Sequence, residues 1–179
     1  MLWIGHIAFG YLSTKLILIF APQFSNSEYN LLMLIGIIAS LLPDLDFIPF
    51  FIKHRSIKLQ KNKSHRKIYS HSPLLWTSIL IIAMFFTTSP LALFTCLVIL
   101  VGSLSHFIAD SIEYGIYWLW PFSSVKWRLR QARGSEPLDK ENSVLGYYTT
   151  FIKKVYIKNW TFYIELFIIT IAILVFLNS

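Results

Sequence analysis

Apolar residues gather in five long runs along this chain, and polar residues fill the connections between them. The runs are Leu2–Ala21, Tyr29–Ile52, Pro73–Thr88, Pro90–Ile112 and Trp160–Leu177. Each is near the roughly 17–25 residues that an α-helix needs to cross a bilayer. The pattern predicts an all-α, polytopic membrane bundle of about five transmembrane helices. The first run has no charged segment before it, so we expect a retained helix and not a cleaved signal peptide.

Composition agrees with this interpretation. The 179 residues suit a single integral membrane domain, 1–179, and 55% of them are hydrophobic. The mean hydropathy of +0.59 is well above that of a soluble globular protein. The single cysteine, Cys96, lies inside the fourth run, which excludes a disulfide framework and a thiolate metal site within the chain.

Positive charge is concentrated in two connections. Residues 53–67 hold seven Lys/Arg and no acid, and residues 126–158 hold eight more. Between apolar spans this bias is typical of cytoplasmic loops, so we expect membrane lipids as partners and no nucleic acid. The topology that follows has a cytoplasmic N-terminus, a cytoplasmic loop at 124–158, a last transmembrane helix at 159–178 and an external C-terminus. The inner membrane of a bacterium is the expected location.

Seven His and Asp side chains in or beside the apolar runs fall at one membrane face in this topology. An Asp at the centre of a span costs at least ~2.5–3.5 kcal/mol, so such residues are functional candidates. The candidates are His6, Asp44, Asp46, His65, His71, His106 and Asp110. Lys and Arg alone set the topology. The shared depth of the seven His and Asp candidates is therefore an independent indication of one site. Glu165, in the last run, could instead face the interface.

Local spacing leaves two alternatives open. His106 and Asp110, four residues apart, share a helix face and could hold a metal ion or form a structural hydrogen bond. Pro43 is expected to break the second helix, after which Asp44 and Asp46 could both turn inward or could cap a helix as solvated acids.

The nitrogen and oxygen donors among these candidates suit Zn²⁺, Mn²⁺ or Fe²⁺. Seven candidates exceed the four ligands of a closed structural zinc site, so we expect one or two ions, with zinc as the first choice.

The motifs and their order resemble the LexA-regulated, inner-membrane metal-dependent hydrolases of bacteria. The matching pieces are GH at 5–6, LLPDLD at 41–46, HR at 65–66, HS at 71–72, GSLSHFIAD at 102–110 and YGIYWLWPFS at 114–123. That family is in turn similar to the zinc-dependent phospholipase C and single-strand nuclease superfamily, helical enzymes that cleave phosphoesters at a His/Asp-rich zinc centre. The resemblance covers residues 5–123 and implies a metal role for all seven candidates.

The function expected from these residues is hydrolysis of a phosphoester in a lipid or lipid-linked substrate at the cytoplasmic face, by a metal-activated water. Asp44 and Asp46 are the expected catalytic carboxylates, with Asp46 taking the proton of the water. Arg66 is expected to pair with a substrate phosphate, or else only sets the topology.

Two other classes of function remain open. A non-enzymatic metal-binding or transport protein would need polar residues that continue to the outer face, where the helices carry only Ser, Thr and Lys15. An interaction protein would bind a cytoplasmic partner or DNA through the charges of residues 53–67 and would not need Asp44 or His106.

Overall fold

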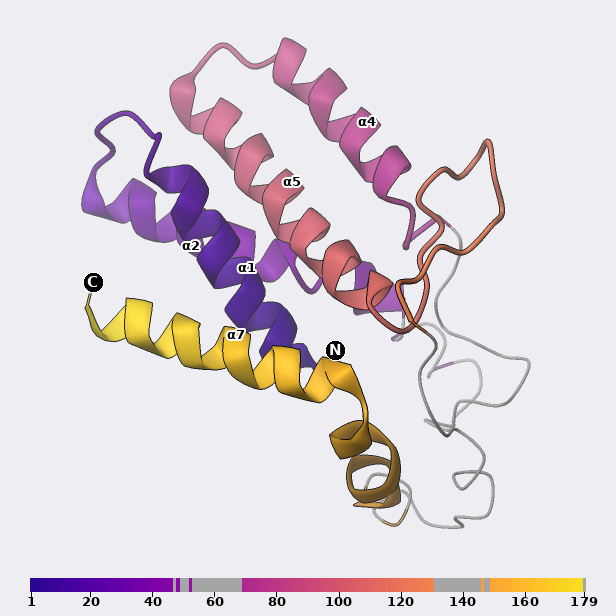
Figure 1. Cartoon of the computed structure of the whole chain (residues 1–179). Coiled ribbons are helices and arrows are strands. Elements are labelled where there is room, and N and C mark those ends of the chain that lie inside the picture. The colour runs from indigo at the N-terminus through magenta and orange to yellow at the C-terminus, as the bar shows by residue number, and fades with distance from the viewer. Residues whose placement is uncertain (47, 49–51, 53–68, 131–145, 147–148, 179) are drawn as a thin grey trace.

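Figure 1 shows the computed structural model, which describes residues 1–46, 48, 52, 69–130, 146 and 149–178. The described chain is all-α, as predicted. Its longer helices are α1 (Trp3–Leu18), α2 (Asn26–Ala39), α4 (Pro73–Phe85), α5 (Pro90–Ser111) and α7 (Trp160–Leu177). Shorter turns are η1 (Leu42–Asp46), η3 (Phe151–Val155) and η4 (Tyr156–Lys158).

Each longer helix overlaps one of the five apolar runs. Among the described residues, α5 and α7 are long and apolar enough to cross a membrane by length and composition, whereas α1, α2 and α4 are shorter. The prediction of five transmembrane spans therefore stays a prediction.

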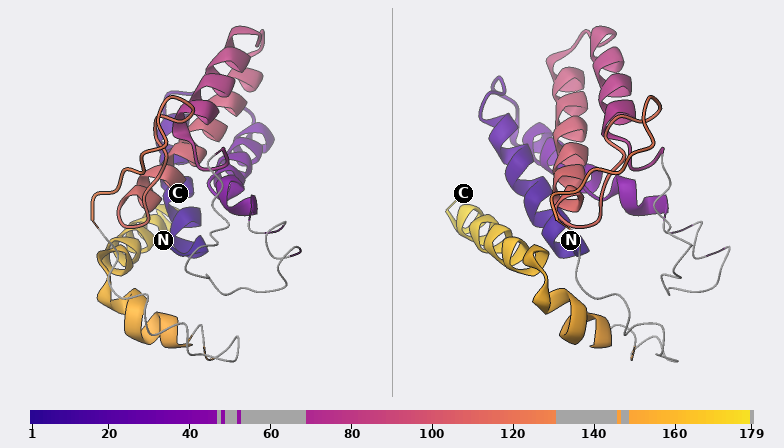
Figure 2. Two further views of the ribbon diagram at one scale, coloured as in Figure 1. Left: turned by 90° about the vertical axis from the view of Figure 1, so that its right-hand side faces the viewer. Right: turned by 45° about the vertical axis from the view of Figure 1, so that its right-hand side comes forward.

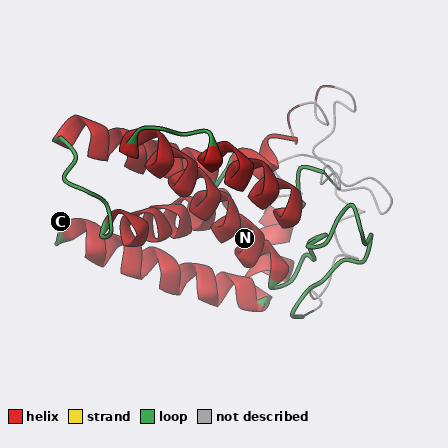
Figure 3. Cartoon of the chain, turned by 90° about the horizontal axis from the view of Figure 1, so that it is seen from above, coloured by secondary structure: helices red, strands yellow, loops and turns green. Residues whose placement is uncertain are grey.

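Consecutive helices run in alternating directions (Figures 1 and 2). The starts of α1, α4 and α7 and the ends of α2 and α5 consequently meet at one end of the bundle, which we call the proximal end. The α1–α2 and α4–α5 turns lie at the other, distal end. Helix α5 contacts α1, α2 and α4, while α7 packs on α1. The described loop after α5, residues 112–130, is larger than the distal turns (Figure 3).

Two glycines allow the central helices to approach closely. A Cβ atom on Gly102 of α5 would lie 2.3 Å from the carbonyl oxygen of Gly36 on α2. A Cβ atom on Gly36 would lie 2.1 Å from Oγ1 of the buried Thr14 on α1. The Gly102 contact is between two helix backbones, where only glycine fits, and the Gly36 contact is with the Thr14 side chain. Both are typical of helices packed through small residues. The approach brings the end of α2 against the last turns of α5.

A buried acid on α7 caps the start of α1. The Glu165 carboxylate accepts hydrogen bonds from the backbone N–H of Leu2 (2.9 Å) and Gly5 (3.1 Å), and from the Tyr156 hydroxyl. Burial, followed by the hydrogen bond to Glu165, raises the pKa of Tyr156 far above its ordinary value, so the phenol stays protonated and donates. The idea that Glu165 faces the interface is wrong, since only 3% of its surface is exposed.

A second buried acid, Glu113, caps α7 in the same manner. It accepts a hydrogen bond from the Trp160 backbone N–H (3.0 Å) and another from the Thr161 hydroxyl. Helix N-termini leave several N–H groups without intrahelical partners, and a carboxylate also favours the positive end of the helix dipole. Glu113 and Glu165 therefore tie α5, α7 and α1 together at the proximal end.

Candidate metal centre

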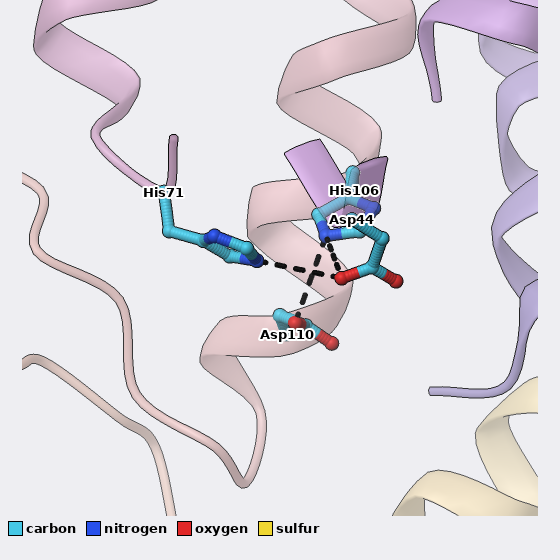
Figure 4. Close-up of side chains that lie close together, drawn as sticks. All are labelled: Asp44, His71, His106 and Asp110. Atoms are coloured by element: carbon cyan, nitrogen blue, oxygen red, sulfur yellow. Dashed lines mark ion pairs between the residues drawn. The ribbon is translucent and has the colours of Figure 1, made fainter. Parts of the chain in front are cut away.

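Four ionisable side chains converge at the proximal end. They are Asp44, His71, His106 and Asp110, and one ligand atom from each lies within 4.8 Å of the others (Figure 4). Asp44 comes from η1, His71 from the segment before α4, and the other two from the last turns of α5. The side chains are 0–1% exposed, except for Asp44 at 12%.

The break after α2 places Asp44 in this cluster. The sequence predicts a break at Pro43; α2 already ends at Ala39, and the 3₁₀ turn η1 then carries both aspartates. The carbonyl oxygen of Ser40, the C-cap of α2, is thereby aimed at α5. If α2 had continued through the whole apolar run, neither the Asp44 side chain nor the Ser40 carbonyl oxygen would be available to the cluster.

The orientation of His106 leaves one ring nitrogen for a cation. Its Nδ1 lies 2.8 Å from the carbonyl oxygen of Ser40. A carbonyl only accepts, so Nδ1 carries the hydrogen, and a neutral ring then has a lone pair on Nε2. That nitrogen lies 3.7 Å from Asp44 Oδ1 and 3.7 Å from Asp110 Oδ2, and it has no hydrogen-bond partner among the described residues.

His71 points its Nε2 at the same place. This atom is 3.4 Å from Asp44 Oδ1, which the His106 ring also faces (Figure 4). The other side of the His71 ring meets Ser70 Oγ at 3.0 Å and Asp46 Oδ2 at 3.5 Å. The imidazole of His71, from the turn before α4, and that of His106, from α5, thus approach Asp44 from segments that are far apart in sequence.

This donor set fits a divalent metal ion. Carboxylates as little exposed as Asp44 and Asp110 are costly unless cations balance their charge, and the Met1 amino group near Asp110 Oδ1 supplies one such cation. An imidazole lone pair facing carboxylate oxygens is also repulsive unless a positive charge lies between them, and a metal ion beside Asp44 Oδ1 and Asp110 Oδ2 would supply it. Metal-binding histidines are commonly fixed by a hydrogen bond from the other ring nitrogen to a carbonyl, as Ser40 does for His106. Two imidazoles and two carboxylates suit several divalent ions, among them Zn²⁺, Mn²⁺ and Fe²⁺.

His6 lies directly beside the four-residue cluster. Its ring stacks on His106 with 4.0 Å between centroids, and its Nε2 is 3.5 Å from Asp110 Oδ1. Neither ring nitrogen has a hydrogen-bond partner among the described residues, although the side chain is fully buried. The same Asp110 oxygen lies 3.2 Å from the amino group of Met1. Asp110 therefore contacts the cluster through Oδ2 and the start of α1 through Oδ1.

Asp46 takes a different place from the one expected. Its Oδ2 accepts a 2.6 Å hydrogen bond from Ser70 Oγ and faces the Nδ1 side of His71, away from the ring nitrogen that points into the cluster. The structure thus brings together four of the predicted residues, with His6 adjacent and Asp46 behind His71. His65 and Arg66 lie outside the described residues.

Sequence reasoning missed two contributors, Ser40 and Ser70. Ser40 acts through its backbone carbonyl, which leaves no signal in the residue type. Ser70 precedes His71 directly in the chain, so a hydroxyl beside a predicted ligand was a signal that could have been used.

No curated protein and no solved structure matches this chain. One protein family, described as "YdjM inner membrane protein", matches residues 1–178. The match includes every helix described above and all four residues of the cluster. The chain therefore belongs to the YdjM inner membrane protein family.

Proposed function

We propose that this protein is a membrane-embedded, metal-dependent hydrolase that cleaves a phosphoester of a lipid or lipid-linked substrate. The observation that carries the proposal is the buried convergence of Asp44, His71, His106 and Asp110. A divalent ion held there would supply a bound water that ionises near neutral pH and a Lewis acid for a phosphoryl oxygen. Zinc is our first choice because it accepts mixed imidazole and carboxylate ligands.

Each residue of the cluster has its own role. His71 and His106 present neutral imidazole nitrogens, and Asp110 supplies a buried negative charge. Asp44 is the proton acceptor for the attacking water, because it is the most exposed of the four and one of its oxygens points away from both histidines (Figure 4). Asp44 takes the role of proton acceptor that the sequence assigned to Asp46, since Asp46 already accepts a hydrogen bond from Ser70.

The arrangement of the helices supports a site at the cytoplasmic face. Both basic connections, 53–67 and 126–158, join helices at the proximal end, where the cluster lies. By the positive-inside rule this end is cytoplasmic, which gives five spans, a cytoplasmic N-terminus and an external C-terminus. Apolar side chains on α7, such as Phe167 and Phe176, are more than 60% exposed, which suits contact with lipid tails. Arg66 keeps its predicted part as a phosphate ligand.

Metal analysis with matched variants tests the proposal. The parent protein, Asp110→Asn and the distal control Glu28→Gln are purified in detergent without chelator. Each is assayed on bis(4-nitrophenyl) phosphate and on phospholipid in mixed micelles. We expect stoichiometric metal and phosphoester cleavage in the parent and in Glu28→Gln, and loss of both in Asp110→Asn at unchanged helix content.

Two results would count against hydrolysis. A parent protein without stoichiometric metal contradicts the metal centre itself. Stoichiometric metal without cleavage of either substrate class favours the non-enzymatic metal-binding or transport protein.

A further inference from the structure

We propose that Ser70 and Asp46 act as a positioning pair that fixes the His71 tautomer and so presents its Nε2 to the metal. The inference rests on the proposed function, because it assigns two residues to the support of the same metal centre. It also changes the part of Asp46 from ligand or proton acceptor to partner of Ser70.

The pair is defined by where each hydrogen lies. An ionised carboxylate only accepts, so the 2.6 Å contact between Ser70 Oγ and Asp46 Oδ2 uses the single hydroxyl hydrogen of Ser70. Ser70 Oγ can then only accept from His71 Nδ1, which lies 3.0 Å away. The hydrogen of a neutral His71 ring is therefore on Nδ1, and the lone pair is on Nε2. That lone pair faces Asp44 Oδ1 at 3.4 Å.

The surroundings keep this pair in place. The Trp76 indole N–H donates to the backbone carbonyl of Ser70 at 3.1 Å, which anchors the segment to the first turn of α4. His71 is 1% exposed and the Asp46 side chain 7%, so water has little access to compete for these hydrogen bonds. A buried hydrogen bond of this kind restricts both ring orientation and tautomer.

His106 provides an internal comparison. Its Nδ1–H is held by the Ser40 carbonyl, and its Nε2 also faces Asp44 Oδ1. Both cluster histidines are thus fixed through Nδ1 and present Nε2, one by the backbone and one by two side chains. Substituting Ser70 or Asp46 can remove the support of His71 without changing a cluster residue. No side-chain substitution removes the Ser40 carbonyl that supports His106.

Metal affinity of the full-length protein in detergent, titrated with Zn²⁺, tests the pair. Loss of such a supporting partner typically weakens metal binding about 10–100-fold, and we expect this for Ser70→Ala and Asp46→Ala. Ser70→Thr keeps the hydroxyl and Asp46→Asn keeps an acceptor oxygen, so both should remain near the parent. Ser13→Ala, which removes a hydroxyl from α1 bonded to the Phe9 carbonyl, is the matched control and should not change the affinity.

The ¹⁵N shifts of the His71 ring give a second readout that needs no metal. We expect Nδ1–H in the metal-free parent and a shift toward Nε2–H in Ser70→Ala. An unchanged affinity in Ser70→Ala, or a His71 ring protonated at Nε2 in the parent, overturns the inference. An equal loss in Asp46→Asn and Asp46→Ala also overturns it, because that is the behaviour of a direct ligand. A parent that binds no metal contradicts the proposed function, while the ring shifts still decide the inference.

Discussion

At the distal end of the bundle, polar groups bond to partners three residues away, as Ser25 with Glu28 and Ser89 with Ala92. The proximal end has local caps too, such as Ser72 with Leu75, but several of its polar pairs join residues much farther apart along the chain. They are 24 residues apart for Ser70 and Asp46, 66 for His106 and Ser40, and 163 for Leu2 and Glu165. Distal packing is apolar and includes Leu18, Leu32 and Val98, all buried.

The two ends of the bundle are therefore stabilised by different interactions. Local caps and apolar contacts define where the distal helices begin and hold them together, without costly buried charge. Buried acids and imidazoles at the proximal end instead depend on the whole arrangement of α1, α2, α5 and α7. Such groups are costly to bury, and among the described residues they gather at the proximal end, which makes that end the candidate for function.

The largest difference between the two ends is expected when one aromatic ring is removed from each, His106 at the proximal end and Phe94 at the distal end. His106→Ala should abolish stoichiometric metal binding, because Nε2 lies between Asp44 and Asp110. Phe94→Ala, which removes the ring that contacts Phe24 at the distal end, should retain the metal and lose about 2 kcal/mol of stability. Metal content and SDS-induced unfolding measure the two effects. Equal metal loss in both variants would mean that the ends are not separable.

Gly102→Ala should affect both ends through the helix contact that joins them. The added Cβ would lie 2.3 Å from the Gly36 carbonyl oxygen, so α2 and α5 must move apart, at a cost of about 1–3 kcal/mol. Because His106 is one turn farther along α5, its hydrogen bond to the Ser40 carbonyl should lengthen and metal affinity should fall as well. Unchanged stability would show that the close approach is unimportant.

Glu165→Gln should loosen the proximal end without touching the cluster directly. The amide keeps one acceptor oxygen but brings an N–H₂ group toward the backbone donors of Leu2 and Gly5, which we expect to cost about 2 kcal/mol. Hydrogen exchange in the first turn of α1 should rise, while the exchange of α2 and α5 stays as in the parent. Equal protection in parent and variant would contradict the capping role.

The smallest effect is expected at the distal start of α5. Ser89→Ala removes the hydroxyl oxygen that accepts a hydrogen bond from the Ala92 N–H, and it should lower stability by about 1 kcal/mol. Zinc affinity should be that of the parent, since the cap and His106 are at opposite ends of the same helix. A lower affinity would show that distal stability is coupled to the site.

Much of the fold could be predicted because hydrophobic patterning is local. The run Trp160–Leu177 is α7 without a residue of difference, and α5 ends one residue before its run does. The end of α2 was harder to predict: the apolar run continues to Ile52, but the helix ends at Ala39. Apolar residues after a helix end look the same in sequence as those inside it.

The sequence could predict that the candidate residues gather at one end of the helices, but not which of them form pairs. Placing Asp44 and Asp46 together assumed irregular backbone, whereas η1 is a 3₁₀ turn in which residues two apart point in different directions. The two acids therefore serve opposite sides of His71. Glu165 was misplaced because its backbone donors, Leu2 and Gly5, are at the other end of the chain.

X-ray absorption spectroscopy of the zinc-loaded protein is the decisive measurement for the metal centre, because it reports the atoms bound to the metal. We expect nitrogen and oxygen ligands at about 2.0–2.2 Å with outer-shell scattering from two imidazoles, and loss of that scattering in the His71→Ala, His106→Ala double variant. A sulfur ligand at about 2.3 Å, or a spectrum that the double variant leaves unchanged, would contradict it.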